Sequence, residues 1–411
     1  MERTVTGSLT YPVARVKLRR VDGGEEWDIT RFAESLSVNT TPWRAADTFS
    51  LSLALPQMPH LDGLQQRLSY GEGGSLTGED VRQFILKGQD FEVMIYLECL
   101  DEPLVEGQEP ELGPPIHWGR VDSESWSLDT GGLRLSLSGR DFVGLLLDKP
   151  LNDRSWDAVN RLDIIKELAD EVGVKVDPEP TGFSDTNLIG DGDSSWSIIQ
   201  RLAHDEGCIA YLQPGTRYLR LEKPPESYDP ERTLVWSALA DEGELPLRSL
   251  SVDRHPPARE KYKVTVTGYN VEKAEIIEAV ADDERELPDS NLVEKRYRRM
   301  DLNDEKALRK QAQYLLNQLA SYEVEVSAGL QGGALELRGG MMVKLRGTGG
   351  ALPVEHKGSG VAGSRAKRTG RKAAVGFDGK YHLSKAAHSL GSGGLTTSLT
   401  LQPPYKAFQV D

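Results

Sequence analysis

Residues Leu133–Leu146 read LRLSLSGRDFVGLL. The first half alternates strictly between apolar and polar side chains, which is typical of a β-strand with one buried face. The alternation breaks at Gly139, where an Arg140-Asp141 pair precedes an apolar run. We therefore predict a strand that ends at Gly139 and passes directly into another element.

The Arg140-Asp141 pair invites a functional interpretation, but neighbouring residues of a strand point to opposite faces. We therefore expect structural roles for both residues, with Arg140 bonding backbone groups at a domain junction. Asp148, which follows the apolar run, is expected to be a turn or cap residue.

Length and composition predict several β-rich domains. A chain of 411 residues exceeds one ordinary core, so we expect two to four domains. Its 41 glycines and 22 prolines favour many turns. No apolar run approaches membrane-spanning length and no signal peptide is evident, so we expect synthesis in a cytoplasm. Cys99 and Cys208 lie in predicted strands and are expected to be buried thiols.

The charge is unevenly distributed. The net charge is -15, and the residues from Ala351 onward carry nine Lys and Arg against three Asp and Glu. The first 350 residues therefore hold 40 basic against 61 acidic side chains, a balance of -21. So acidic a body repels a nucleic-acid backbone, which disfavours general DNA binding.

The N-terminal third reads as strands. Phe49–Leu55, Phe91–Leu97 and Leu133–Leu137 each alternate between apolar and polar residues. Polar loops, Pro56–Gly88 and Glu102–Pro115, separate them. This pattern predicts an antiparallel barrel or sandwich with long excursions.

The pattern changes after Pro150. A helix is predicted around Leu162–Val172 and is ended by Gly173. A second helix, capped by Ser194 or Ser195 and ended by Gly207, leads into a hairpin over Cys208–Leu221. Together they predict a compact α+β module.

Strands return from Arg248, with Val264 and Val266 on the opposite face from Thr265 and Thr267. One predicted helix interrupts these strands. It is capped by Asn303 or Asp304 and carries an apolar stripe between Leu308 and Leu319. Further strands are predicted at Tyr322–Ala328, Ala334–Leu337, Met341–Leu345 and Leu395–Leu401. We predict a β-rich α+β fold with a first β domain at 1–150, a peripheral α+β module at 151–246 and a second β domain at 247–411. The second domain holds one helix and a basic Gly/Ser-rich loop at 356–376.

Four segments, taken in order, resemble hub proteins of the phage late control protein D family, which are related to the hub portion of type VI secretion spikes. They are Ser138–Asp148, the Trp196–Ala203 helix with its hairpin, the Ala307–Leu319 helix with the Leu337–Val343 step, and Gly379–His388 with Leu395–Leu401. The resemblance implies two tube-forming antiparallel β-barrel-like domains per chain. It also implies a homotrimer whose six such domains adapt a sixfold tail tube to a threefold spike.

The resemblance further implies partners and a location. The partners would be a tail tube protein, a separate central spike protein and other baseplate proteins, because the chain ends soon after its last predicted strand. The location would be the baseplate of a virion tail, or of a phage-derived injection device, assembled in the host cytoplasm. DNA would pass through an acidic lumen without specific binding.

Three motifs are candidate ligand sites. Gly358–Gly363 matches GxGxxG, but no strand precedes it and no helix follows, so no dinucleotide site is expected. The basic loop lacks interleaved aromatic residues, which favours a protein contact within the assembly, or disorder until assembly, over DNA. Asp191-Gly192-Asp193 lacks the distal Glu of a calcium loop, and capping and dipole complementation of the following helix explain its carboxylates more simply.

No catalytic, cofactor-binding or metal-binding residue is predicted, and no cofactor. The seven histidines show no metal-ligand spacing, although His382 and His388 are placed to share one face of a strand. We find no Gly-x-Ser-x-Gly elbow, His-Glu-x-x-His motif or P-loop, so we expect no enzyme. Two alternatives stay open: a tail-associated peptidoglycan-degrading enzyme, and a receptor- or glycan-binding β protein.

Overall fold

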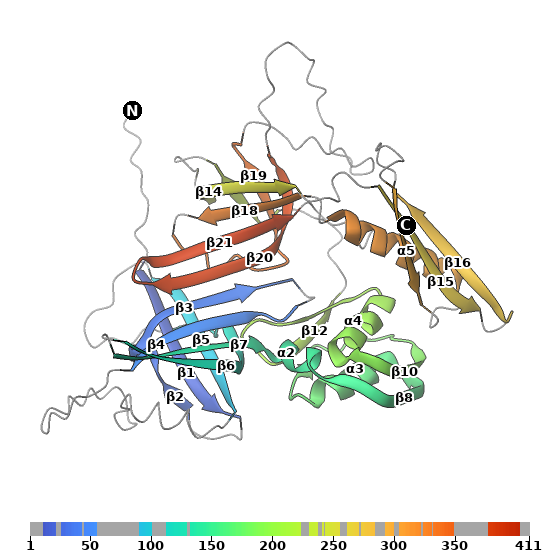
Figure 1. The fold of residues 1–411 in the computed structure, drawn as a ribbon, viewed down its shortest axis with the longest axis horizontal. Helices are drawn as coiled ribbons and strands as arrows, with labels where there is room; N and C mark the ends of the chain where they lie inside the picture. The colour runs from blue at the N-terminus through green and yellow to red at the C-terminus, as the bar shows by residue number, and fades with distance from the viewer. Residues whose placement is uncertain are drawn as a thin grey trace, which may run out of the picture. The chain divides into compact units, whose positions relative to one another are not determined.

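Most predicted strands and helices fall in the part of the chain that the computed structural model describes (Figure 1). That part comprises residues 11–21, 26–42, 45–55, 90–100, 112–129, 132–222, 230–236, 241, 243–254, 261–270, 273–283, 292–299, 304–321, 324–330, 332–348 and 377–402. The predicted loops Pro56–Gly88, Glu102–Pro115 and 356–376 lie wholly or largely outside it, as does the GxGxxG match.

The chain forms two units. Unit 1 comprises Met1–Lys223, Gly332–Glu336 and Ala387–Thr397. Unit 2 comprises Pro224–Gln331, Leu337–Ala386 and Ser398–Asp411. The C-terminal hairpin therefore contributes residues to both units.

Unit 1 begins with a sheet of antiparallel neighbours in the order β3-β4-β7-β6-β5-β1-β2 (Figure 1). Its strands are β1 (Tyr11–Arg20), β2 (Glu26–Asp28), β3 (Ala33–Thr40), β4 (Thr48–Leu55), β5 (Phe91–Leu100), β6 (His117–Asp129) and β7 (Gly132–Asp141), with a 3-10 helix η1 at Thr30–Phe32. The predicted alternations are confirmed, because the apolar positions of β4, β5 and β7 share one buried core.

β7 does not end where the sequence predicted. It runs through Gly139 to Asp141, because Arg140 still pairs with Thr48 of β4 and Arg120 of β6. The predicted end at Gly139 is therefore wrong. The apolar run becomes helix α2 (Phe142–Leu147), which starts at the next residue.

The rest of unit 1 is the α+β module. It contains β8 (Pro150–Asn160), α3 (Arg161–Asp170), β9 (Lys175–Val176), β10 (Asp185–Ser194), α4 (Ser195–Asp205), β11 (Ile209–Leu212) and β12 (Tyr218–Glu222). β8 pairs with β10 (Figure 1). The β11–β12 hairpin is joined by β9. α2, α3 and α4 share a core with the apolar side chains of these strands.

Both predicted helices of the module are confirmed. The Ser194 hydroxyl accepts the Ser197 backbone N–H at 3.2 Å, so it is the predicted cap of α4. Gly173 and Gly207, which follow the two helices, adopt φ angles of +73° and +72°. Glycine reaches this left-handed region without a Cβ penalty, which explains the predicted helix ends.

Unit 2 contains a closed six-stranded β-barrel in the order β19-β13-β14-β18-β21-β20, with β20 returning to β19. Its strands are β13 (Arg232–Val235), β14 (Glu244–Arg254), β18 (Val324–Leu330), β19 (Met342–Arg346), β20 (Gly379–Gly391) and β21 (Gly394–Gln402). The predicted β-rich, barrel-like class is confirmed. Two pairings differ from the expected antiparallel pattern, because β13 runs parallel to both β14 and β19.

A separate layer in unit 2 replaces part of the expected second barrel. Strands β15 (Lys261–Asn270), β16 (Glu275–Asp282) and β17 (Leu292–Arg298) form their own sheet, and helix α5 (Glu305–Ser321) packs on it (Figure 1). Val264 and Val266 are buried towards α5, as the alternation predicted. The Asp304 carboxylate accepts the Ala307 N–H at 3.1 Å, and Asp304 is thus a cap of α5.

One predicted strand is wrong. Residues Ala334–Leu337 form no strand, because Gly332 and Gly340 take φ angles of +88° and +92° on either side of them. The Ala334 N–H is donated to the hydroxyl of Thr397 at 3.1 Å instead of to a neighbouring strand.

Among the described residues, the helices all fall short of the length and apolarity needed to cross a membrane.

Candidate functional site: the junction between the first sheet and the α+β module

Two glycines allow β6 and β7 to approach closely at the edge of the module. A Cβ atom at Gly139 would lie 1.8 Å from the carbonyl oxygen of Arg120. A Cβ atom at Gly119 would lie 2.2 Å from the carbonyl oxygen of Arg140. Both distances are far inside van der Waals contact, so these strands hold their pairing because neither position carries a side chain.

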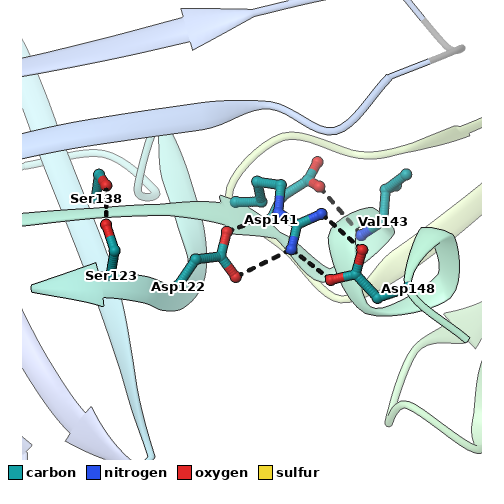
Figure 2. Close-up of polar contacts among 7 residues, drawn as sticks. Asp122, Ser123, Ser138, Asp141, Val143 and Asp148 are labelled. Atoms are coloured by element: carbon teal, nitrogen blue, oxygen red, sulfur yellow. Dashed lines mark hydrogen bonds and ion pairs between the residues drawn. The ribbon is translucent and has the colours of Figure 1, made fainter.

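A β-bulge lies next to this close approach. The register of β6 on β7 shifts between Val121 and Ser123, which leaves Asp122 as the extra residue. The hydroxyl oxygens of Ser123 and Ser138 are 2.7 Å apart across the bulge (Figure 2). The bulge thereby sets the position from which Asp122 reaches Arg140.

Arg140 binds two carboxylates and not the backbone groups that the sequence led us to expect, so that expectation is wrong. Its Nε donates to Asp122 at 2.6 Å, and its Nη1 donates to Asp148 at 3.0 Å (Figure 2). Hydrogen bonds to Asp148 and Asp122 raise the pKa of Arg140, and the same guanidinium lowers the pKa of Asp148. Arg140 therefore ties β6 to the end of α2, where Asp148 is the predicted cap residue.

Asp141 starts the helix that enters the module. Its carboxylate accepts the Val143 N–H at 3.0 Å and caps α2 (Figure 2). Its own N–H is donated to the carbonyl of Asp47 at 2.9 Å. Burial, together with repulsion from Asp47, raises the pKa of Asp141 well above its ordinary value.

A buried ion pair lies on the face of β5 that points away from the core of the first sheet. The Glu92 side chain is 2% exposed, and its carboxylate binds the guanidinium of Arg217, next to β12. The indole Nε1 of Trp118 donates to the other carboxylate oxygen at 3.0 Å. The Arg217 guanidinium also lies 4.8 Å from the ring centroid of Trp118 and 4.4 Å from that of Phe142.

Sequence reasoning missed Glu92, Trp118 and Arg217. Glu92 stands at an outward position of the alternating β5 pattern, where a charged residue normally faces water. Met94, two residues further along the same face, is also buried. The same face also carries Tyr96 and Glu98, so its sequence pattern does not show that another element covers Glu92.

His117 is a buried histidine beside the junction. Its ring packs at 5.1 Å from the ring of Phe49, and its Nε2 has no hydrogen-bond partner among the described residues. Burial lowers the pKa of His117 to about 3. The imidazole is therefore neutral in the folded chain.

This burial predicts a loss of stability in mild acid. The unfolded chain takes up a proton near pH 6.5 and the folded chain only near about pH 3, so stability falls as the pH falls through that window. Between about pH 7 and about pH 5 the loss is about 2 kcal/mol. Urea unfolding of His117→Leu at both pH values is expected to lack this part of the loss. An unchanged pH dependence in the variant would contradict the assignment to His117.

The remaining candidate residues lie apart from the junction. Asp193 binds Arg201 of α4 at 3.2 Å and Ser194 caps the helix, so the capping part of the expectation is wrong for Asp193. Asp193 stands one residue before the cap, at the helix end where the dipole favours a carboxylate. The Asp191 side chain lies outside the described residues. His388 is buried in unit 1 and bonds the Thr397 hydroxyl at 3.0 Å, whereas His382 belongs to unit 2.

The two histidines do not share a face as expected. Tyr381 and Leu383 are buried at odd positions and Ala386 and His388 at even ones, so the set of β20 residues that points inward changes between Leu383 and Ala386.

Cys208 belongs to the module core, and Cys99 packs half-buried against the first sheet. The described residues contain no group of three metal-ligating side chains.

The polar groups of the junction bind one another. Asp122, Asp148 and Glu92 are held by guanidinium groups, and Asp141 is held by backbone N–H groups. Such pairing fixes the positions of β5, β6, β7, α2 and β12. These contacts connect the first sheet rigidly to the α+β module.

Comparison with known proteins shows which solved structures have a similar fold. No protein-family model and no curated protein sequence matches the chain. Among solved structures, a tail protein from Neisseria meningitidis MC58 is 19% identical, with a TM-score of 0.59 over 95% of this chain and 96% of that one. The 43 kDa tail protein of prophage MuSo2 from Shewanella oneidensis is 13% identical, with a TM-score of 0.60 over 96% of this chain and 100% of that one.

The chain therefore has the fold of phage tail proteins across nearly its whole length. The resemblance to tail hub proteins drawn from four sequence segments is confirmed at the level of the fold.

Proposed function

We propose that the chain is a structural hub in the baseplate of a contractile phage tail or of a phage-derived injection device. In this role three copies form a ring that adapts a sixfold tail tube to a threefold spike. The end-to-end match in fold to two tail proteins carries the proposal. The division 1–150, 151–246 and 247–411 into two tube domains and a peripheral module is part of it.

The physical character of the chain supports a mechanical role. Its junction residues are engaged in ion pairs, caps and hydrogen bonds that join elements. A hub works through large protein interfaces, for which such rigid joints are suited. We accordingly propose no catalytic activity, and purified chain is expected to leave host cell walls intact in a zymogram.

The proposed partners are a tail tube protein, a separate central spike protein and other baseplate proteins. The balance of -21 over the first 350 residues supports a lumen that repels passing DNA. A basic lumen in the assembled ring would contradict this part of the proposal.

Immunogold labelling of purified particles tests the proposed position. Antibodies against this chain are expected to mark one end of each tail, where the tube meets the spike. Label along the whole tube, on the head, or missing from intact particles would contradict a baseplate hub. Label for the tube protein along the tail in the same preparation serves as the control.

A further inference from the structure

The layer of β15, β16 and β17 has one face that α5 does not cover. Four of the nine large hydrophobic side chains that the described residues expose lie on it. They are Tyr269, Ile276, Val280 and Leu292, with exposed fractions of 37%, 65%, 44% and 42%. We call this surface the open face. Tyr269, Ile276 and Val280 lie along β16 and the neighbouring end of β15, whereas Leu292 lies opposite Lys261 at the other end of the layer. Exposed apolar side chains on one surface, as along β16, indicate an interaction site.

The register of the strands gives the open face two halves. Tyr269 pairs with Ile276 and Thr265 with Val280, so the apolar half lies along β16. Arg296 and Arg298 stand opposite Thr265 and Thr267 on β17, so the other half is cationic. Four basic residues of the face, Lys261, Lys263, Arg296 and Arg298, outnumber its three acids, Glu278, Asp282 and Glu294.

The acids of the open face are already engaged. Glu278 accepts the Thr267 hydroxyl at 3.2 Å. Asp282 and Glu294 lie 3.9 Å from the cations of Lys263 and Arg296. The face therefore combines exposed apolar side chains with a net charge of +1, in a chain whose net charge is -15.

The α+β module has the opposite charge. Residues 150–222 contain fourteen Asp and Glu against seven Lys and Arg, a balance of -7. Asp163 and Asp170 are exposed on α3 and are two helical turns apart, so they lie on the same side of the helix. Lys166 stands between them but is paired with Glu179 at 2.9 Å, so this side of α3 is negative beside the net-positive open face.

We propose that the open face of one copy docks on the α3 surface of the neighbouring copy's α+β module. The inference rests on the proposed trimeric hub. A threefold ring needs head-to-tail contacts, in which two different surfaces of one chain complement each other. Here the apolar half would supply buried area, and Arg296 and Arg298 would face Asp163 and Asp170.

Charge reversal tests the contact in the full-length chain. The double variant Arg296→Glu/Arg298→Glu is expected to weaken trimer formation about 100-fold in sedimentation equilibrium, because it sets like charges opposite each other. Adding Asp163→Lys and Asp170→Lys to that variant is expected to restore the trimer. Ile276→Ser tests the apolar half and is expected to weaken the trimer about tenfold.

Lys295→Glu/Lys310→Glu is the matched control, since it changes the charge equally on the α5 side of the layer. It is expected to trimerise like the wild type, and all variants are expected to melt like the wild type. A trimer that survives Arg296→Glu/Arg298→Glu overturns the docking while leaving the proposed hub standing. If adding Asp163→Lys and Asp170→Lys does not restore the trimer, the α+β module is not the surface on which the open face docks. A wild-type chain that never trimerises contradicts the hub itself.

Discussion

Replacing Gly139 with alanine is expected to lower the free energy of unfolding of unit 1 by about 3 kcal/mol or more. The new Cβ would lie 1.8 Å from the carbonyl oxygen of Arg120 and 2.8 Å from Cε1 of Phe49. The nearer atom belongs to the backbone of β6, so relief requires the two strands to separate and their ladder hydrogen bonds to lengthen. Urea unfolding followed by tryptophan fluorescence reports the change, since Trp118 and Trp126 lie on β6.

Gly113→Ala is the matched control for this experiment. A Cβ atom at Gly113 meets nothing within 4 Å, so its effect is expected to stay within about 0.5 kcal/mol. Gly119→Ala is expected to resemble Gly139→Ala, and the double variant is expected to lose less than the sum because both relieve the same close approach. A Gly139→Ala chain as stable as Gly113→Ala would contradict the strand pairing at the junction.

Arg217→Met is expected to lower the free energy of unfolding of unit 1 by about 3–5 kcal/mol. The substitution leaves the Glu92 carboxylate, 2% exposed, with the Trp118 indole as its remaining described partner. It also removes the guanidinium from the rings of Trp118 and Phe142. Chemical unfolding at neutral pH measures the loss.

The second variant, Glu92→Gln/Arg217→Met, separates the buried charge from general damage to packing. Because it removes both charges, it is expected to recover most of the stability lost in Arg217→Met. Arg201→Met is the matched control, since its partner Asp193 is 45% exposed and the pair is worth at most about 1 kcal/mol. Equal losses in Arg217→Met and Arg201→Met would contradict a buried ion pair at the junction.

Local patterns predicted the strands and helices that have a clear apolar periodicity. The alternation of β4, β5 and β7 and the apolar stripes of α3, α4 and α5 appear as buried positions, because each pattern matches the period of its element. Ser194 and Gly207 marked the ends of α4 because a cap and a left-handed glycine act within one helical turn.

Features that depend on distant partners could not be predicted. Gly139 looked like a strand end, but it meets a β6 backbone whose approach no local pattern shows. Arg140 was expected to bind backbone groups, yet the bulge at Asp122 sets its partners. The buried Glu92 is paired with Arg217, which lies next to β12 and is 125 residues away along the chain. β15 was expected in a barrel because strand periodicity does not say which sheet a strand joins.

The hub role itself is tested most directly by the mass of the assembly. Native mass spectrometry of the purified chain, alone and mixed with its tail tube protein and its spike protein, gives the number of copies in each complex. The proposed hub predicts three copies of this chain bound to one spike trimer, and the same trimer bound to the tube protein. A chain that stays a monomer and joins neither protein would contradict it.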